Sequence, residues 1–243
     1  MCYFNSLVAP KGATITLSGT TKQLDPTNRP LQSGFSYHNW PIVKGSTENF
    51  TIENAHWELI APWVKTTQEV QVGREKFNTL NATAERLFES KLFKPAALNN
   101  RCLVLSSGFY EWRHYKPAGA IKEIAYPYFI TIKEQSLFYM AGIFQPWTDK
   151  ETGETMDTFS IVTTKANAFM EQIHNKKKRM PTILTEAQAS EWLNPCLSES
   201  KIMELASITY DANQLSAYTL DKSFRTASNP MEAFNYPELP GLI

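Results

Sequence analysis

The segment RCLVLSSGFYEW, residues 101–112, decides the fold expected for this chain. Its opening, RCLVL, is an apolar run behind Arg101, which is typical of a strand buried on both faces. The run leads into GFYEW, where Glu111 stands between aromatic residues. We therefore expect a buried strand followed by an acidic side chain that is either exposed or held in an apolar wall with a raised pKa.

Comparable strand-like segments lie on both sides of this one. Residues 1–20 read as strand and turn, and further strands are expected at 35–43 (with a break at Pro41), 50–52, 54–60, 128–132, 137–144 and 158–163. Helical spacing or a capping residue, such as Thr185, predicts helices at 82–94, 166–173, 185–194 and 198–206. Loops are expected at 21–34 and 113–126, and the proline-rich tail, 229–243, is expected to be irregular.

Strands outnumber helices in this pattern, and they do not alternate with helices as βαβ units do. The pattern predicts an α+β fold: a single domain over residues 1–243 with an antiparallel, barrel-like β-sheet core and peripheral helices.

The composition limits the classes of function. The net charge is zero, so binding to nucleic acid must use a local basic patch. Three distant cysteines favour a reducing compartment and show no metal-ligand spacing. Neither a basic leader nor an apolar run of the ~20 residues that span a bilayer is present. We expect a cytoplasmic protein, associated with the nucleoid when bound to DNA, that uses no membrane, metal or cofactor.

The chain begins Met1-Cys2, and removal of Met1 would leave an amine and a thiol on adjacent carbons. The amine is partly neutral near its ordinary pKa of about 7.7–8.0, and the thiol is strongly nucleophilic. An amine forms a Schiff base with an aldehyde, and a nearby thiol can close on the same carbon as a thiazolidine. Position alone favours an incidental cysteine, so this aldehyde trap needs support from elsewhere in the chain.

Other residues are unusual for a generic core. Asn81 is either a helix N-cap or a functional amide. His174 precedes the basic residues 176–179, which form either a solvated loop or a phosphate-binding patch beside an acid–base group. The aromatic residues Trp57, Trp63 and Trp112 pack in the core or stack on unpaired bases.

Seven segments, taken in order, resemble the SOS-response-associated peptidase (SRAP) domain family. They are Met1-Cys2, WELIAPW at 57–63, Asn81-Ala82, GFYEW at 108–112, AGIF at 141–144, Thr163-Thr164, and His174 followed by Arg179-Met180-Pro181. The resemblance extends from residue 2 to about residue 192. It implies a single-domain, β-rich fold that binds abasic sites in single-stranded DNA, most simply as a monomer, and links to them covalently through the N-terminal cysteine.

The resemblance also implies roles for the matched residues. Cys2 would be the nucleophile, Asn81 would orient the N-terminus or the sugar, Glu111 would be the acid–base group, and His174 would help to open the sugar ring. The residues expected to contact DNA are Trp63, Arg74, Trp112, Thr163, Lys176, Lys177, Lys178 and Arg179.

The chain departs from the family pattern in its arginines. Family members often have Gly-Arg after Met-Cys and an arginine after Asn-Ala, whereas this chain has Tyr3-Phe4 and Thr83. The loop after His174 is longer than the common form and is filled by lysines 176–178. We expect these lysines to replace the missing arginines at DNA phosphates.

Two other functions compete with DNA crosslinking. Cys2, His174 and Glu111 could form the triad of a cysteine peptidase that acts mainly on its own N-terminus. Trp63, Trp112 and the lysines could instead form a non-catalytic binder of single-stranded DNA. A lyase activity is related to the first function, because a Schiff base at an abasic sugar permits β-elimination.

Overall fold

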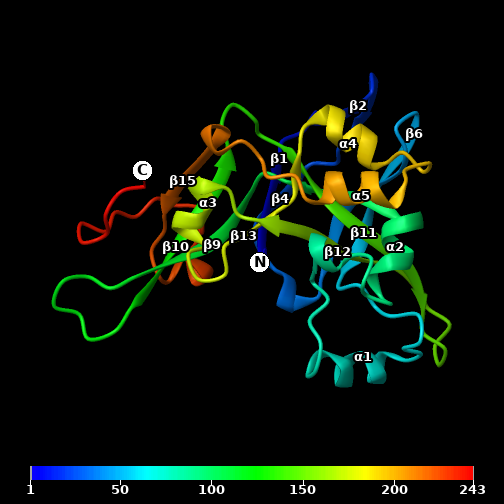
Figure 1. Ribbon diagram of the computed structural model, residues 1–243, viewed down its shortest axis with the longest axis horizontal. Helices are drawn as coiled ribbons and strands as arrows, with labels where there is room; N and C mark the ends of the chain where they lie inside the picture. The colour runs from blue at the N-terminus through cyan, green and yellow to red at the C-terminus, as the bar shows by residue number, and fades with distance from the viewer. Residues whose placement is uncertain (1, 243) are drawn as a thin grey trace.

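The computed structural model describes residues 2–242 (Figure 1). Five strands close into a barrel, which runs through β12 (Thr155–Lys165), β6 (Asn49–Trp57), β5 (Asn39–Ser46), β8 (Arg101–Ser106) and β11 (Phe138–Thr148) and then returns to β12. The pairings are antiparallel except that of β12 with β6, which is parallel. Closure leaves these five strands without a free edge.

A second sheet of five antiparallel strands lies beside the barrel. Its order is β15 (Leu215–Thr219), β10 (Ile124–Ile132), β9 (Gly108–Tyr115), β1 (Phe4–Ala9) and β4 (Thr27–Ser33). Ser107 alone separates β8 from β9, so the chain passes directly from the barrel into this sheet. The two strands of segment 101–112 therefore connect the two halves of the fold.

Short strands and helices complete the structure. β7 (Asn81–Thr83) and β13 (Arg179–Pro181) both pair with β12, β14 (Ile183–Leu184) pairs with β11, and β2 (Thr14–Leu17) forms a hairpin with β3 (Thr20–Gln23). The helices are α1 (Thr67–Arg74), α2 (Phe93–Asn99), α3 (Ala168–Ile173), α4 (Glu186–Trp192) and α5 (Glu199–Ala206). Figure 1 shows α2, α4 and α5 gathered on one side of the barrel and α3 beside the second sheet.

Buried side chains form one main cluster that includes residues of both sheets. Inside it, Trp57 packs against both Trp40 and Phe159, with ring centroids 6.1 Å apart in each pair. A smaller cluster around Tyr110 and Phe129 belongs to the second sheet. The shared main core confirms the α+β class, the barrel and the single-domain fold.

The predicted helix at 82–94 is wrong. Residues 81–83 pair with β12 as β7, a 3-10 turn (η2, Ala84–Arg86) follows, and α2 begins only at Phe93. Of the apolar residues that suggest a helical period, Leu87 is buried from a turn, Phe88 and Leu92 are half-buried in turns, and Phe93 begins α2. Pairing with a distant strand therefore overrides the local periodicity.

Several other boundaries also differ from those expected. The predicted loop at 21–34 contains the end of β3 and all of β4, and the predicted loop at 113–126 contains the ends of β9 and β10. β5 runs through Pro41 without a break, and residues 50–57 form one strand. The elements α1 and β15 were not expected. The helices at 166–173, 185–194 and 198–206 are confirmed in position, as are the Thr185 cap and, through residue 242, the irregular tail.

Arg101 is expected to be a main support of the helical side of the barrel. Its guanidinium, buried behind β8, donates hydrogen bonds to the carbonyl oxygens of Ala97, Leu98, Trp192 and Asn194 at the ends of α2 and α4. Arg101→Met keeps the apolar stem and leaves these acceptors without donors. We expect a loss of about 2–4 kcal/mol in the free energy of unfolding, measured by urea denaturation.

Arg86→Met is the matched control, because Arg86 is exposed on the surface. Equal effects of the two substitutions would contradict the assignment of a structural role to Arg101.

Candidate active site

Cys2 lies just before β1 and is completely buried. Its thiol lies 3.9 Å from the carbonyl oxygen of Phe4, a weak hydrogen bond. Burial, together with the negative charge of Glu111, raises the pKa of the Cys2 thiol above its ordinary value. The thiol is therefore protonated at neutral pH. The state of Met1 lies outside the described residues.

Glu111 reaches the start of the chain because β9 runs antiparallel to β1, with Asn5 opposite Phe109 and Ser6 opposite Gly108. The Glu111 side chain is 4% exposed. Burial raises the pKa of Glu111 to about 7, although the positive charge of Lys177 opposes the shift. Of the two expected environments, the apolar wall is confirmed, and the carboxyl can both give and take a proton near neutrality.

His174 follows α3 and faces Glu111, with Nε2 3.7 Å from the carboxyl Oε2. Its Nδ1 lies 2.8 Å from the carbonyl oxygen and 3.1 Å from the amide nitrogen of Arg179, and the tautomer decides which contact is a hydrogen bond. Burial lowers the pKa of His174 to about 4, so the imidazole is neutral at physiological pH.

Asn175 fixes the loop that carries His174. The His114 amide donates to the Asn175 side-chain oxygen at 3.0 Å, and the Asn175 side-chain nitrogen donates to the His114 carbonyl oxygen at 2.7 Å. This reciprocal pair holds the loop against β9, the strand that carries Glu111. In the sequence, only its position directly after His174 distinguishes Asn175 from an ordinary loop residue.

Asn81 lies in β7 opposite Ile161 of β12, so the N-cap alternative is wrong. The side chain is 6% exposed, and neither its nitrogen nor its oxygen has a hydrogen-bond partner among residues 2–242. Leaving a buried amide unpaired costs about 1–3 kcal/mol for each group. Such an unpaired amide calls for an explanation, and the ligand-binding role predicted for Asn81 is one that it would fit.

Thr163 and Arg179 belong to the same group of strands as Asn81, because β7 and β13 both pair with β12. Thr163 lies opposite Thr83 of β7, and Arg179 lies opposite Lys165 of β12. The Arg179 guanidinium donates to Glu85 Oε1 and to the carbonyl oxygen of Thr163, both at 2.6 Å. The hydrogen bond from Arg179 lowers the pKa of Glu85. The charge of Arg179 is thus partly neutralised, and Glu85 is a further residue that sequence analysis did not single out.

The three lysines of the loop differ in their partners. Lys176 pairs with Glu123 at 2.5 Å, and Lys178 pairs with Glu171 at 3.4 Å. Lys177 is exposed and has no ion pair within the described chain. Its positive charge opposes the rise in the pKa of Glu111 and adds to the fall in the pKa of His174. Lys177 is therefore the lysine with an available charge near the site.

The other three residues predicted to contact DNA are Trp63, Trp112 and Arg74. Trp63 is 57% exposed, whereas Trp112 is half-buried against Phe4, with ring centroids 5.1 Å apart. Arg74 donates to both carboxylate oxygens of Glu58. The DNA contacts of these three predicted residues stay predictions.

The site residues form two groups that meet at one place. Cys2, Glu111 and His174 lie together, and Asn81, Thr163 and Arg179 lie on adjacent strands. The contact between His174 and the backbone of Arg179 joins the groups. Within the described chain, no group of three His, Cys, Asp or Glu side chains could hold a metal ion, and no helix is long and apolar enough to cross a bilayer.

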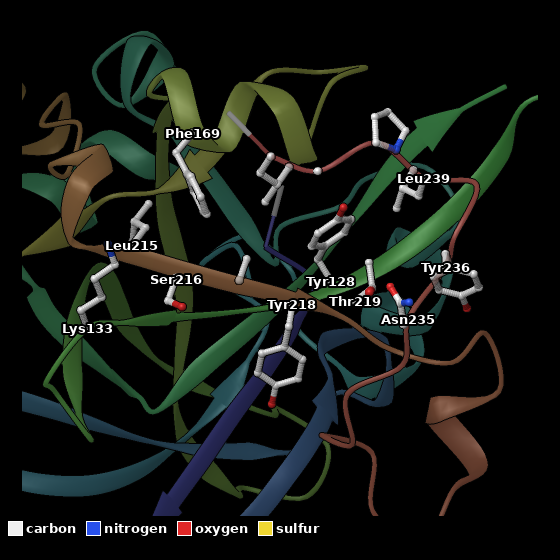
Figure 2. Close-up of a pocket in the computed structure, with 14 residues that line it drawn as sticks. Tyr128, Lys133, Phe169, Leu215, Ser216, Tyr218, Thr219, Asn235, Tyr236 and Leu239 are labelled. Carbon is white, nitrogen blue, oxygen red and sulfur yellow. The ribbon is translucent and has the colours of Figure 1, made fainter. Parts of the chain in front are cut away.

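The structure also has a surface pocket of about 470 Å³. Figure 2 shows that Phe169 of α3, strand β15 and the C-terminal segment near Tyr236 surround it. None of the predicted site residues lines this pocket. A second surface pocket, of about 630 Å³ and lined by residues 28–32 and 37–39, likewise contains none of them, so neither pocket marks the predicted site.

The chain is similar to known proteins both in sequence and in fold. The chain is 34% identical over 198 residues to the abasic site processing protein YoqW of Bacillus subtilis, covering 82% of this chain and 79% of YoqW. It is 30% identical over 161 residues to the abasic site processing protein HMCES of Pongo abelii, covering 57% of this chain and 44% of HMCES. A crystal structure of a Bacteroides thetaiotaomicron protein matches 95% of this chain and 97% of that one, with 32% identity and a TM-score of 0.77.

The sequence model described as SOS response associated peptidase (SRAP) matches residues 8–226, which is most of the chain. That match and the relatives above confirm the resemblance found in the sequence. The chain belongs to the SOS response associated peptidase (SRAP) family.

Proposed function

We propose that this protein processes abasic sites in single-stranded DNA by linking to them covalently through Cys2, after removal of Met1. One observation carries the proposal. The buried Glu111 carboxyl has a pKa of about 7 and lies near Cys2, which becomes the N-terminal residue once Met1 is removed. The names of the relatives, abasic site processing proteins, support the same substrate.

The chemistry balances without a cofactor. The Cys2 amine attacks the aldehyde carbon of the open abasic sugar, and loss of one water gives a Schiff base. The thiol sulfur then adds to that carbon as the C=N π bond breaks, and the thiol proton is transferred to the nitrogen, closing a five-membered thiazolidine. The aldehyde and the amine–thiol pair condense with loss of one water, and nothing is oxidised or reduced.

Two buried groups can move the protons that these steps need. Protonated Glu111 can give a proton to the departing hydroxyl, and ionised Glu111 can take the proton of the thiol. Neutral His174 can accept a proton as the sugar ring opens, because its pKa of about 4 leaves the imidazole uncharged. The unpaired amide of Asn81 offers a donor and an acceptor to the sugar or to the new N-terminus.

Self-processing remains the second candidate function. A free Cys2 amine requires that Met1 be removed, and a single turnover on the chain's own N-terminus would suffice. The fully buried thiol of Cys2 supports self-processing over general proteolysis, because a separate peptide would have to reach it. Intact mass of Cys2→Ala and Glu111→Gln proteins, beside the unmodified chain, tests whether these residues affect Met1 removal.

Cys2→Ala is expected to abolish a heat-stable crosslink, because alanine keeps the amine and lacks the thiol that closes the ring. The measurement is a denaturing gel of protein mixed with a single-stranded oligonucleotide that carries one abasic site. Undamaged DNA is the control, and borohydride should still trap the Schiff base of the variant. A lack of heat-stable crosslink from unmodified protein with verified loss of Met1 would rule out the proposed function.

Glu111→Gln is expected to slow crosslinking by about 10²-fold or more while stabilising the protein at high pH. The folded carboxyl has a pKa of about 7 against an ordinary value of 4.5. Its contribution to stability is therefore full below pH 4.5 and is lost as the pH rises through 7. Glutamine does not ionise, so the variant should be more stable by about 3 kcal/mol above pH 8.

Thermal or urea unfolding at pH 4.5 and pH 8 measures this difference. A variant no more stable than the unmodified protein at pH 8 would show that Glu111 does not carry the shifted pKa.

Lys177→Ala is expected to weaken DNA binding more than Lys176→Ala or Lys178→Ala, because only Lys177 lacks an ion pair among the described residues. Loss of one phosphate contact should reduce the slope of log affinity against log salt concentration by about 0.7 for a single strand. The measurement is a salt titration by fluorescence anisotropy with a labelled oligonucleotide. Equal slopes for the three variants would mean that the loop does not contact phosphate through Lys177.

A further inference from the structure

An exposed aromatic ring stands beside the start of the chain. Phe35 lies in the 3-10 helix η1 (Gly34–Ser36) and is 48% exposed. Its ring centroid is 4.9 Å from that of Tyr3, the residue directly after Cys2, and the two planes are tilted by 41°. Phe35 thus presents one part of its ring to solvent while Tyr3 supports another.

The backbone under Phe35 is held in place. The Gly34 amide donates to the Tyr3 carbonyl oxygen at 2.8 Å, and the Phe35 amide donates to Ser33 Oγ at 3.2 Å. A Cβ at Gly34 would approach Leu80 to 3.1 Å and Trp57 to 3.2 Å, so η1 sits directly on the core. This exposed ring is therefore positioned before any ligand binds.

The same contacts place Phe35 at the edge of the proposed site. Tyr3 is adjacent to Cys2, and burial together with the charge of Glu111 raises the pKa of Tyr3. Leu80, which lies against Gly34, is adjacent to Asn81. Gly34, the residue before Phe35, thus contacts both Tyr3, next to Cys2, and Leu80, next to Asn81, and Phe35 itself packs on Tyr3.

We propose that Phe35, supported by Tyr3, is the stacking surface for the nucleobase next to the abasic site, and so positions the sugar for Cys2. This inference rests on the proposed function. An abasic position leaves its neighbouring base without one stacking partner, and a fixed phenyl ring can take that place. Phe35 has no hydrogen-bonding group, so the contact should accept any base and favour the larger face of a purine.

The test combines a protein change with a DNA change. Phe35→Ala is compared with the unmodified protein on oligonucleotides that carry one abasic site between adenines. In two further oligonucleotides, a tetrahydrofuran spacer replaces the adenine on the 5′ side or on the 3′ side. Phe35→Ala should lower the crosslinking rate at limiting DNA by about 5- to 100-fold when both adenines are present. The effect should shrink to less than about 2-fold on one of the two spacer oligonucleotides, which identifies the stacked base.

Two variants complete the design. Phe35→Trp should retain the rate, because it keeps a flat ring, and Phe234→Ala should match the unmodified protein. Phe234 is a fair control because it is 43% exposed and packs on Tyr236, in the C-terminal segment. No loss for Phe35→Ala, or the same loss on all three oligonucleotides, would overturn the inference.

Equilibrium binding separates this inference from the proposed function. A tetrahydrofuran in place of the abasic site cannot open to an aldehyde, so anisotropy with such oligonucleotides reports stacking without crosslinking. If the unmodified protein formed no crosslink but Phe35→Ala still weakened binding only when the neighbouring base was present, the proposed chemistry would fail and the stacking surface would stand. Unchanged binding by Phe35→Ala would overturn the stacking surface whatever the crosslinking result.

Discussion

The close pairing of β1 with β9 is the constraint on which the site depends. Gly108 of β9 lies opposite Ser6 of β1, and its missing side chain leaves room for the Phe129 ring of β10, which a Cβ at Gly108 would approach to 2.2 Å. Hydroxyl groups complete the join: Ser106 donates to Asn5 at 2.7 Å, and Ser107 accepts from the Val8 amide at 3.0 Å. Ser107 is also the only residue between β8 and β9. The position of β8 in the barrel therefore determines where β9 begins, and so where Glu111 lies relative to the start of the chain.

The interior around Cys2 favours uncharged groups. Burial raises the pKa of the thiol and of Glu111 and lowers that of His174, so each shift moves a group toward its neutral form. At the margin of the site, by contrast, charged side chains occur, and Arg179 is paired there with Glu85 while Lys177 has no ion pair among the described residues. A site of this kind suits the transfer of single protons between neutral partners, which is what imine and ring-closing chemistry needs.

Short sequence patterns correctly predict features that depend on neighbouring residues, such as an apolar strand or a helix cap. The apolar run behind Arg101 is a fully buried strand, and Thr185 caps α4 with Gln188 in a complete capping box. Short motifs and a family resemblance predict catalytic roles for Cys2, Glu111 and His174, and the structure brings these three residues together, while their roles stay predictions. Long-range pairing could not be predicted: Asn81 belongs to a strand because it pairs with β12, and Arg179 meets a glutamate 94 residues away. The lysine run shows the same limit, since acidic partners outside the loop distinguish Lys177 from its neighbours.

The parallel pairing of β6 with β12 also affects the order in which the protein can form. Trp57 lies opposite Phe159, so the ring of strands joins segments about a hundred residues apart in the chain. During synthesis from the N-terminus, β5 and β6 can form their hairpin early, but the ring cannot close until β12 has left the ribosome. Closing such long loops costs entropy before it gives contacts, which makes folding slow. The partly made chain must therefore keep the apolar faces of β5, β6 and β8 from associating with other chains until the last strand of the barrel arrives.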